Sequence, residues 1–430
     1  MTRNLTFLPL VALILLASVG CESAGPAARE TPAPTSVTEF DAMPAADRQA
    51  IYATLPELYI EPLEGDGYMG RIALADANAI LLVDSAGGRA TVFPEDLCPR
   101  VLFGLRLALM PDGGIYTAIE HQRRRLLVPG PLADEARKQL AALAEEHPTF
   151  APVIDNALAS PLAPVRHPDV PAAVSEFSQR AAAIIGDRLN AELHLVATDH
   201  FLIYTTGPTD QDAALAEHCE TVYHYLLAGT DLPAHAAVWP APLAVYCFAT
   251  PEQYDAFVQL AMPDDSVRLL ANSDGFCAGD DGLSYLVLNG ANMTDPAFTE
   301  RLTHETAHAF YRQYLSDVLL PHWLDEGLAE IAVAAMLPDS NARARYADIT
   351  RRMATVPDAG YFSVDVPIRR DRDYAAAQAF VRHLQSDRGP QFDTFFRLLK
   401  TDANQADAFE RGFELPPYEL MVRWEASIRD

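Results

Sequence analysis

Two histidines, His304 and His308, lie four residues apart in the stretch RLTHETAHAFYRQY at residues 301–314. The apolar spacing predicts a helix, and Asp295-Pro296 supplies a capping carboxylate followed by a proline suited to the first helical position. Residues four apart on a helix project from one face, so both imidazoles can bind a single metal ion. Glu305 is rotated by about 100° from His304 and can reach a water at that ion more easily than the ion itself. The pattern therefore predicts two metal ligands and a general base.

A tetrahedral catalytic zinc also needs a third protein ligand and one open position. The stretch PHWLDEGLAEIAVAAML at residues 321–337 predicts a second helix, which Pro321 opens. Glu326 follows His308 by 18 residues (326 − 308), a length that allows an antiparallel return beside the histidines. Gly327 is small enough for a close approach of the two helix backbones. Glu330 shares the face of Glu326 and can accept the second ring N–H of a ligand histidine. We expect about one Zn²⁺ per chain.

The pair of motifs HETAH and WLDEGLAE resembles the gluzincin metallopeptidases, and more closely the peptidase MA-like domains of many bacterial exported proteins. The resemblance implies that His304, His308 and Glu326 bind zinc and that Glu305 is the catalytic base. It also implies an α+β fold for residues 172–430, with a gluzincin-like catalytic domain whose mixed sheet is followed by a helical part. In the aminopeptidase N-like branch the third ligand comes one residue later, and LNGANMTD does not match the G-x-M-E-N motif of that branch. Aminopeptidase specificity is therefore not inferred.

A further group should stabilise the oxyanion that forms when a peptide bond is hydrolysed. Tyr374 begins a predicted helix in DYAAAQAFVRHLQ, a segment that also resembles peptidase MA-like domains, and it is the candidate. The alternative is a core tyrosine packed with Phe380 and Val381. We interpret His322 as a surface residue. The other histidines, such as His200 and His224, lack ligand spacing.

The elements that must position these residues are predicted by their hydrophobic patterns. Helices are expected at residues 172–192, 210–229 and 251–261, strands within 193–206 and at 242–249, and a hairpin at 274–290. Residues 283–289 directly precede the motif helix, and we expect this strand to be an exposed edge along which an extended peptide substrate could pair. Cys247 and Cys277 are expected to lie close together, with Cys98 single, and Cys219 is expected to be a buried thiol.

The N-terminus has the features of an export signal. Residues 1–20 combine Arg3, an apolar run from Leu5 to Leu16 and small residues directly before Cys21. This arrangement resembles a bacterial lipoprotein signal peptide, which implies a lipid on Cys21 and a protein anchored to a membrane surface in the cell envelope. An ordinary secretory signal is the alternative. Residues 21–45 are rich in Ala, Pro, Thr, Ser and Glu and predict a flexible tether.

Residues 46–165 predict a small β-rich domain of unknown role. Short apolar runs between residues 68 and 130, broken by Gly and Pro, read as strands, and Arg123-Arg124-Arg125 reads as a solvated strand edge. Residues 132–147 predict an amphipathic helix that closes this unit.

Composition limits the possible functions. Half of the 430 residues are apolar, and the formal charge of −27 argues against a nucleic-acid partner. The leading hypothesis is a zinc-dependent peptidase that acts on a peptide or protein substrate. The alternative is a non-catalytic envelope lipoprotein that uses a peptidase-like fold as a binding module. The complete ligand set and the intact Glu305 favour the enzyme.

Overall fold

The computed structural model divides into two compact units, Met1–Gly114 and Ile115–Asp430. It describes strands between residues 57 and 92, a few positions between 103 and 110, residues 112–189, 191–261, 273–279 and 283–339, residue 343, and residues 371–429. The predicted signal peptide, the tether and Cys21 lie outside the described residues, as does Cys98. Within the described part of the chain, no helix combines the length and the apolar character needed to cross a membrane.

The first unit contains an antiparallel sheet in the order β1-β2-β3-β4. Its strands are β1 (Glu57–Ile60), β2 (Tyr68–Ala75), β3 (Ile80–Val83) and β4 (Arg89–Val92). Each strand pairs with the next along the chain, and the β2–β3 register shifts between Ile72 and Leu74. The strands predicted from the apolar runs between residues 68 and 93 are therefore confirmed.

The strands predicted over residues 114–128 are wrong. Gly113–Arg125 forms helix α5, which is followed by α6 (Pro131–Glu146) and α7 (Ala151–Ala159). Ile115 and Ile119, four residues apart, pack with Leu140 and Ile154 in one small core. This spacing is helical, but it is masked in the sequence by the short apolar runs around it. The helix predicted at residues 132–147 is confirmed as α6. The sequence predicts a domain boundary near residue 165, whereas the structure divides at residue 114.

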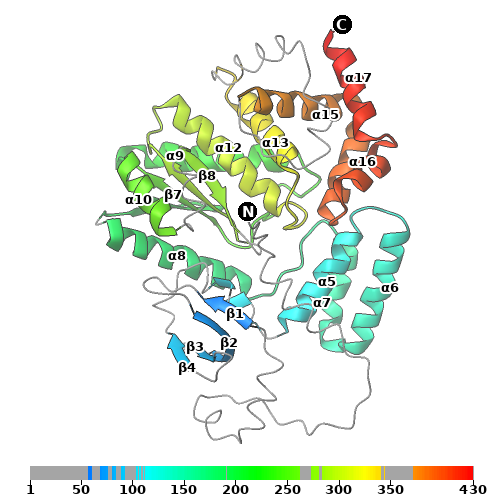
Figure 1. The fold of residues 1–430 in the computed structure, drawn as a ribbon, viewed down its shortest axis with the longest axis horizontal. Coiled ribbons are helices and arrows are strands. Elements are labelled where there is room, and N and C mark those ends of the chain that lie inside the picture. The colour runs from blue at the N-terminus through cyan, green and yellow to red at the C-terminus, as the bar shows by residue number, and fades with distance from the viewer. Residues whose placement is uncertain are drawn as a thin grey trace, which may run out of the picture. The chain divides into compact units, whose positions relative to one another are not determined.

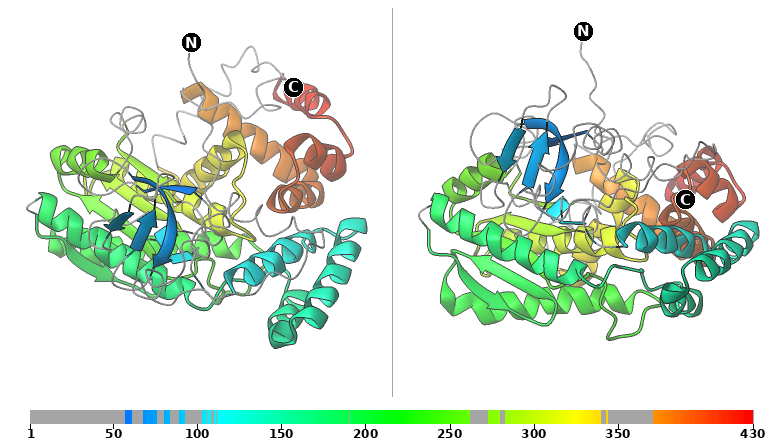
Figure 2. Two further views of the ribbon diagram at one scale, coloured as in Figure 1. Left: turned by 60° about the horizontal axis from the view of Figure 1, so that its bottom comes forward. Right: turned by 90° about the horizontal axis from the view of Figure 1, so that it is seen from below.

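The second unit is built on a mixed sheet flanked by helices (Figures 1 and 2). The sheet has five strands in the order β5-β6-β7-β9-β8. The strands are β5 (His194–Ala197), β6 (Phe201–Thr205), β7 (Leu243–Phe248), β8 (Gly275–Ala278) and β9 (Tyr285–Asn289). β6, β7 and β9 are parallel, and the outer strands β5 and β8 are antiparallel to their neighbours. The mixed α+β class, the buried strand at β7 and the β8–β9 hairpin are as predicted.

Helices cover both faces of this sheet. Val245 and Cys247 of β7 belong to the main core together with residues of α9 (Asp212–Ala228) and α12 (Pro296–Gln313). The alternate residues Tyr246 and Phe248 pack against Phe257 of α10 (Pro251–Ala261). The hydroxyl of Tyr246 donates to a carbonyl of α8 (Val170–Leu189). Side chains alternate between the faces of a strand, so β7 buries both of its faces.

Two predictions about this sheet are wrong. β9 lies between β7 and β8, so the strand before the motif helix is interior and the edge is β8. The reason is that β9, the second strand of the hairpin, pairs with β7, so β8, the first strand, is left at the edge of the sheet. Cys247 and Cys277 lie on strands separated by β9, where they pair with Leu288 and Leu286. Two strand spacings alone amount to about 9.6 Å, and the two-residue offset adds to this, so the cysteines are too far apart for a disulfide. Cys219, Cys247 and Cys277 are free thiols, and Cys219 is fully buried as predicted.

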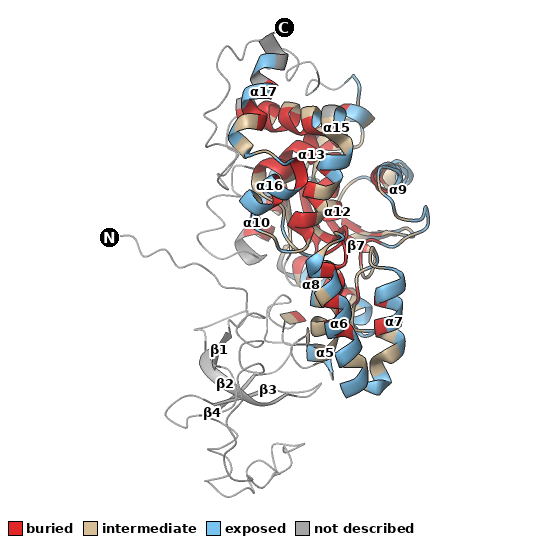
Figure 3. Ribbon diagram, turned by 90° about the vertical axis from the view of Figure 1, so that its right-hand side faces the viewer, coloured by how far each residue is buried: buried red, intermediate tan, exposed pale blue. Residues whose placement is uncertain are grey.

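The chain after the motif helix is helical. It contains α13 (His322–Met336), α15 (Asp371–Lys400), α16 (Gln405–Phe413) and α17 (Pro417–Arg429). Buried residues concentrate in α12, α13 and α15 (Figure 3). Gly327 allows a close helix contact, but with α15 instead of α12, since a Cβ at this position would lie 2.8 Å from the carbonyl oxygen of Ala377. Trp323 stacks on Phe409 and donates to the side chain of Gln405, which fixes α13 against α16.

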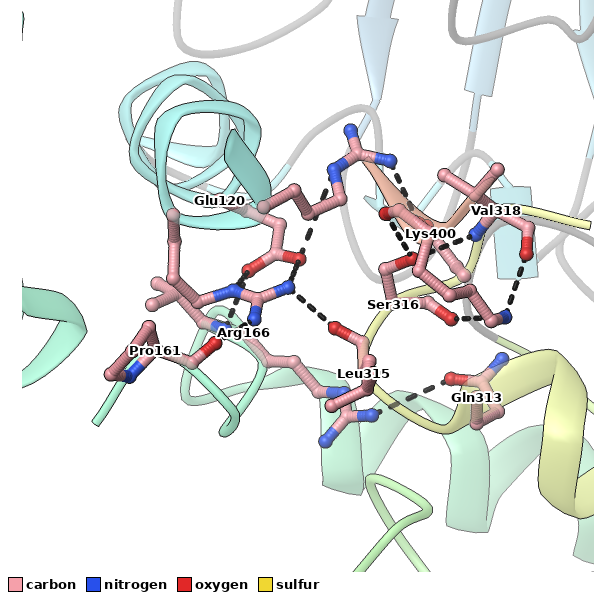
Figure 4. A network of polar contacts seen from close by, with 12 residues as sticks. Glu120, Pro161, Arg166, Gln313, Leu315, Ser316, Val318 and Lys400 are labelled. Atoms are coloured by element: carbon pink, nitrogen blue, oxygen red, sulfur yellow. Dashed lines mark hydrogen bonds and ion pairs between the residues drawn. The ribbon is translucent and has the colours of Figure 1, made fainter. Parts of the chain in front are cut away.

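The loop between α12 and α13 is held by two buried basic side chains, Arg123 and Lys400 (Figure 4). Arg123 is fully buried, forms an ion pair with Glu120 at 2.7 Å and donates at 2.5 Å to the carbonyl of Leu315, a residue in the left-handed region at φ 67°. The sequence predicts that Arg123 lies on a solvated strand edge, and this prediction is wrong. Arg123 is buried and anchors α5 to this loop. Lys400 donates to the carbonyls of Ser316 and Val318 at 3.0 and 2.7 Å, and burial lowers its pKa to about 7. Because Glu326 follows the loop, these contacts help to set its position relative to the histidines.

Candidate metal centre

The motif helix α12 begins where the sequence predicts, at Asp295-Pro296, and it ends at Gln313. Asp295 is the N-cap, and its side chain accepts from the backbone N–H of Ala297 at 3.0 Å, while Pro296 occupies the first helical position. Leu302 and Phe310 are fully buried and hold one side of the helix against the core. Thr303 contacts His218 of α9 at 2.9 Å, so α9 fixes the helix directly beside His304.

His304, His308 and Glu326 converge on one point. The Nε2 atoms of the two histidines are 3.0 Å apart, and Glu326 Oε2 lies 3.1 Å from His304 Nε2 and 3.4 Å from His308 Nε2. A tetrahedral zinc ion with bonds of about 2.1 Å places its ligand atoms roughly 3.4 Å apart. The three predicted ligands therefore lie at nearly the spacing that such an ion requires, and they form one of the two metal-compatible groups in the described part of the chain.

Carboxylates orient both imidazole rings from the other side. Glu330 Oε1 lies 3.2 Å from His304 Nδ1, as the sequence predicts. Asp325 Oδ2 lies 3.0 Å from His308 Nδ1, a contact that the sequence analysis missed. A carboxylate this close to Nδ1 favours a proton on that nitrogen, which leaves Nε2 as the ligand atom. The sequence signal that could have identified Asp325 is its position directly before Glu326, in the first turn of α13.

Negative charge is concentrated around the two imidazoles. Burial alone would favour neutral rings, but Asp325 and Glu326 raise the pKa of His308 to about 10, and Glu326 and Glu330 raise the pKa of His304 well above its usual range. Burial likewise opposes ionisation of Glu326, but the two histidines hold its pKa well below its usual range. Asp325 and Glu326 therefore stay ionised, and protons on the rings balance their charge; a divalent cation could replace these protons.

Glu305 and Tyr374 lie beside this centre. Glu305 is half-buried, and its carboxylate forms no hydrogen bond or ion pair with the residues that the structure describes. Tyr374 is half-buried near the start of α15, and its ring is 6.5 Å from the ring of His304 at an interplanar angle of 62°. It also packs against the small cluster of Val333 and Ala375. Both predicted catalytic residues are therefore near the ligands, and Tyr374 has apolar contacts as well.

Two further residues complete the surroundings. His322, interpreted from the sequence as a surface residue, is partly exposed, and its Nδ1 lies 3.4 Å from Glu326 Oε1. Arg312 continues the helix face of His304 and His308 by one more turn. Although burial raises the pKa of Asp325, the charges of His308 and Arg312 hold it below its usual value.

No match to the chain was found among protein-family models, curated proteins or solved structures.

Proposed function

We propose that the chain is a zinc-dependent peptidase of the gluzincin type, with His304, His308 and Glu326 as the zinc ligands. The observation that carries the proposal is the convergence of their three donor atoms at 3.0 to 3.4 Å, with a carboxylate behind each imidazole. Two imidazoles and one carboxylate form a donor set typical of catalytic zinc, with one position left for water or substrate. The sequence resemblance to peptidase MA-like domains supports the same assignment.

The residues around the centre have separate roles in the proposed reaction. When bound, Zn²⁺ supplies Lewis acidity to the attacking water and the scissile carbonyl. Glu305 accepts the proton of that water and delivers it to the leaving amine. The hydroxyl of Tyr374 donates a hydrogen bond to the oxyanion of the tetrahedral intermediate. Glu330 and Asp325 hold the imidazoles in the required orientation. We further propose that the enzyme acts on peptides or proteins in the cell envelope, anchored through a lipid on Cys21.

Removal of metal tests the proposed function directly. We expect the purified chain to digest a peptide library, to lose this activity after dialysis against a chelator, and to regain it when zinc is restored. Cleavage that continues in chelator-treated, zinc-free protein would contradict the zinc mechanism. A chain that binds zinc but cleaves no peptide would support the binding-module alternative.

Tyr374→Phe tests the role of the hydroxyl. Loss of one oxyanion donor typically lowers kcat by ~10²–10³-fold, and we expect a decrease in this range, with little change in KM or zinc content. Tyr418→Phe is the control, because Tyr418 is 65% exposed. If Tyr374→Phe lowers Tm but leaves kcat unchanged, Tyr374 is a packing residue.

A further inference from the structure

A second group of metal-binding side chains lies on α9 and on the turn between β5 and β6. His200, Glu220 and His224 each offer one ligand atom, and these atoms all lie within 4.8 Å of one another. His200 Nδ1 is 2.7 Å from Glu220 Oε2, and His224 Nε2 is 3.7 Å from the same oxygen. Glu220 and His224 are four residues apart on one helix face, and His200 comes from the turn. None of the three belongs to the centre on α12 and α13.

The backbone holds His200 and Glu220 in place. The N–H of His200 donates to Glu220 Oε1 at 2.9 Å, and its carbonyl accepts from the N–H of Leu243 at 2.8 Å. The His200 ring stacks on Tyr223 with a centroid distance of 3.9 Å, and Tyr223 is fully buried. Two of the three ligand atoms are therefore fixed before any ion binds, which lowers the ordering cost of binding.

His224 forms the adjustable side of the group. Its side chain is 57% exposed, whereas the side chains of His200 and Glu220 are 20% and 22% exposed. Its ring meets the His200 ring edge-on at a centroid distance of 5.6 Å. Rotation of this exposed side chain can bring its nitrogen to the spacing of roughly 3.4 Å that a tetrahedral ion requires. The exposed side of α9 (Figure 3) leaves the fourth position open to water.

The geometry points to a second transition-metal site in which His200, Glu220 and His224 bind one Zn²⁺. A histidine–carboxylate hydrogen bond accounts for the contact of His200 with Glu220, and the i,i+4 spacing on α9 accounts for the approach of His224 to Glu220. The observation that favours a metal site is that both imidazoles meet the same carboxylate oxygen, with the three ligand atoms within 4.8 Å of one another. Two imidazoles and a carboxylate suit zinc better than calcium or magnesium, which prefer oxygen ligands. The bound ion would join the β5–β6 turn to α9. The sequence analysis missed this group because His200 is distant in the chain from Glu220 and His224. The pair on the helix is also a glutamate and a histidine, not two histidines as in the motif at His304 and His308.

Metal stoichiometry of four variants tests this site. After equilibration with ZnCl₂ and gel filtration, we expect two zinc ions per wild-type chain, one in His224→Ala, one in His308→Ala and none in the double variant. His235→Ala is the control, because His235 is also an exposed histidine but belongs to neither metal-compatible group. The control should keep two.

The single variants separate the two sites. If His224→Ala binds as much zinc as the wild type, the second site does not exist. If His308→Ala binds as much as the wild type while His224→Ala loses one ion, the second site stands and the ligand assignment of the peptidase centre fails. Tm of His308→Ala gives a second measurement: it should rise with added ZnCl₂, and this rise should disappear when His224→Ala is added. An unchanged Tm in His308→Ala at saturating ZnCl₂ would overturn the role of the ion in joining the turn to the helix.

Discussion

Replacement of Glu305 by glutamine is expected to lower peptide turnover by ~10²–10⁴-fold, the usual contribution of a general base, while the zinc content stays that of the wild type. The amide has nearly the shape of the carboxylate but cannot accept a proton from the attacking water. Glu305 is rotated by about 100° from His304 on α12, away from the direction in which the ligands converge. Kinetic assays with a cleaved peptide and metal analysis of the same samples measure both quantities.

Glu326→Gln should have the opposite profile. Glu326 Oε2 contacts both ligand nitrogens, so its loss should weaken zinc binding, remove one zinc ion per chain and lower turnover in a way that added zinc partly restores. Glu410→Gln, an exposed glutamate on α16, is the control for both variants. If Glu305→Gln loses metal while Glu326→Gln keeps it, the two roles are reversed and the gluzincin assignment is wrong. If both keep zinc and hydrolysis is unchanged, the peptidase function itself is refuted.

The sequence predicts best those features that depend on short-range geometry. The spacing of His304 and His308 on one helix, the Asp295 cap and the amphipathic helices α6 and α9 follow from local periodicity, and the structure confirms them. Glu326 and Glu330 could be placed because the return from α12 to α13 is short. The position of Tyr374 beside His304 could be proposed only from family resemblance, since it depends on the packing of α15 against Gly327.

Features that depend on non-local pairing could not be predicted. The place of β9 inside the sheet and the separation of Cys247 from Cys277 follow from strand order, which the hydrophobic pattern leaves open. Arg123 is buried because distant backbone carbonyls and Glu120 surround it, although three consecutive arginines normally indicate a solvated surface. His200 meets Glu220 only because β6 packs beside α9. Asp325 could have been found, since a carboxylate next to a ligand is a common position for orienting an imidazole.

Zinc affinity at the centre of His304 and His308 should rise steeply with pH, by about 100-fold per unit between about pH 7 and 9. In the metal-free protein both imidazoles have raised pKa values, that of His308 being about 10, whereas zinc needs both rings neutral. Binding should therefore release two protons per ion. The raised pKa values also stabilise the fold in the absence of zinc. This stabilisation is fully present below the pKa of a histidine in the unfolded chain, about 6.5, and it is lost as the pH rises through the pKa values of the folded state.

Competition with a chelator of known affinity at several pH values measures this dependence, and His224→Ala should be used so that only one centre is titrated. The slope of log K against pH should be close to two, and calorimetry in buffers of different ionisation enthalpy should give the same proton count. Asp325→Asn removes the charge that contributes most to the raised pKa of His308, so its slope should fall toward one. A slope near zero in the parent would mean that the histidines are neutral before the ion arrives, and the carboxylates around them would then serve only to orient the rings.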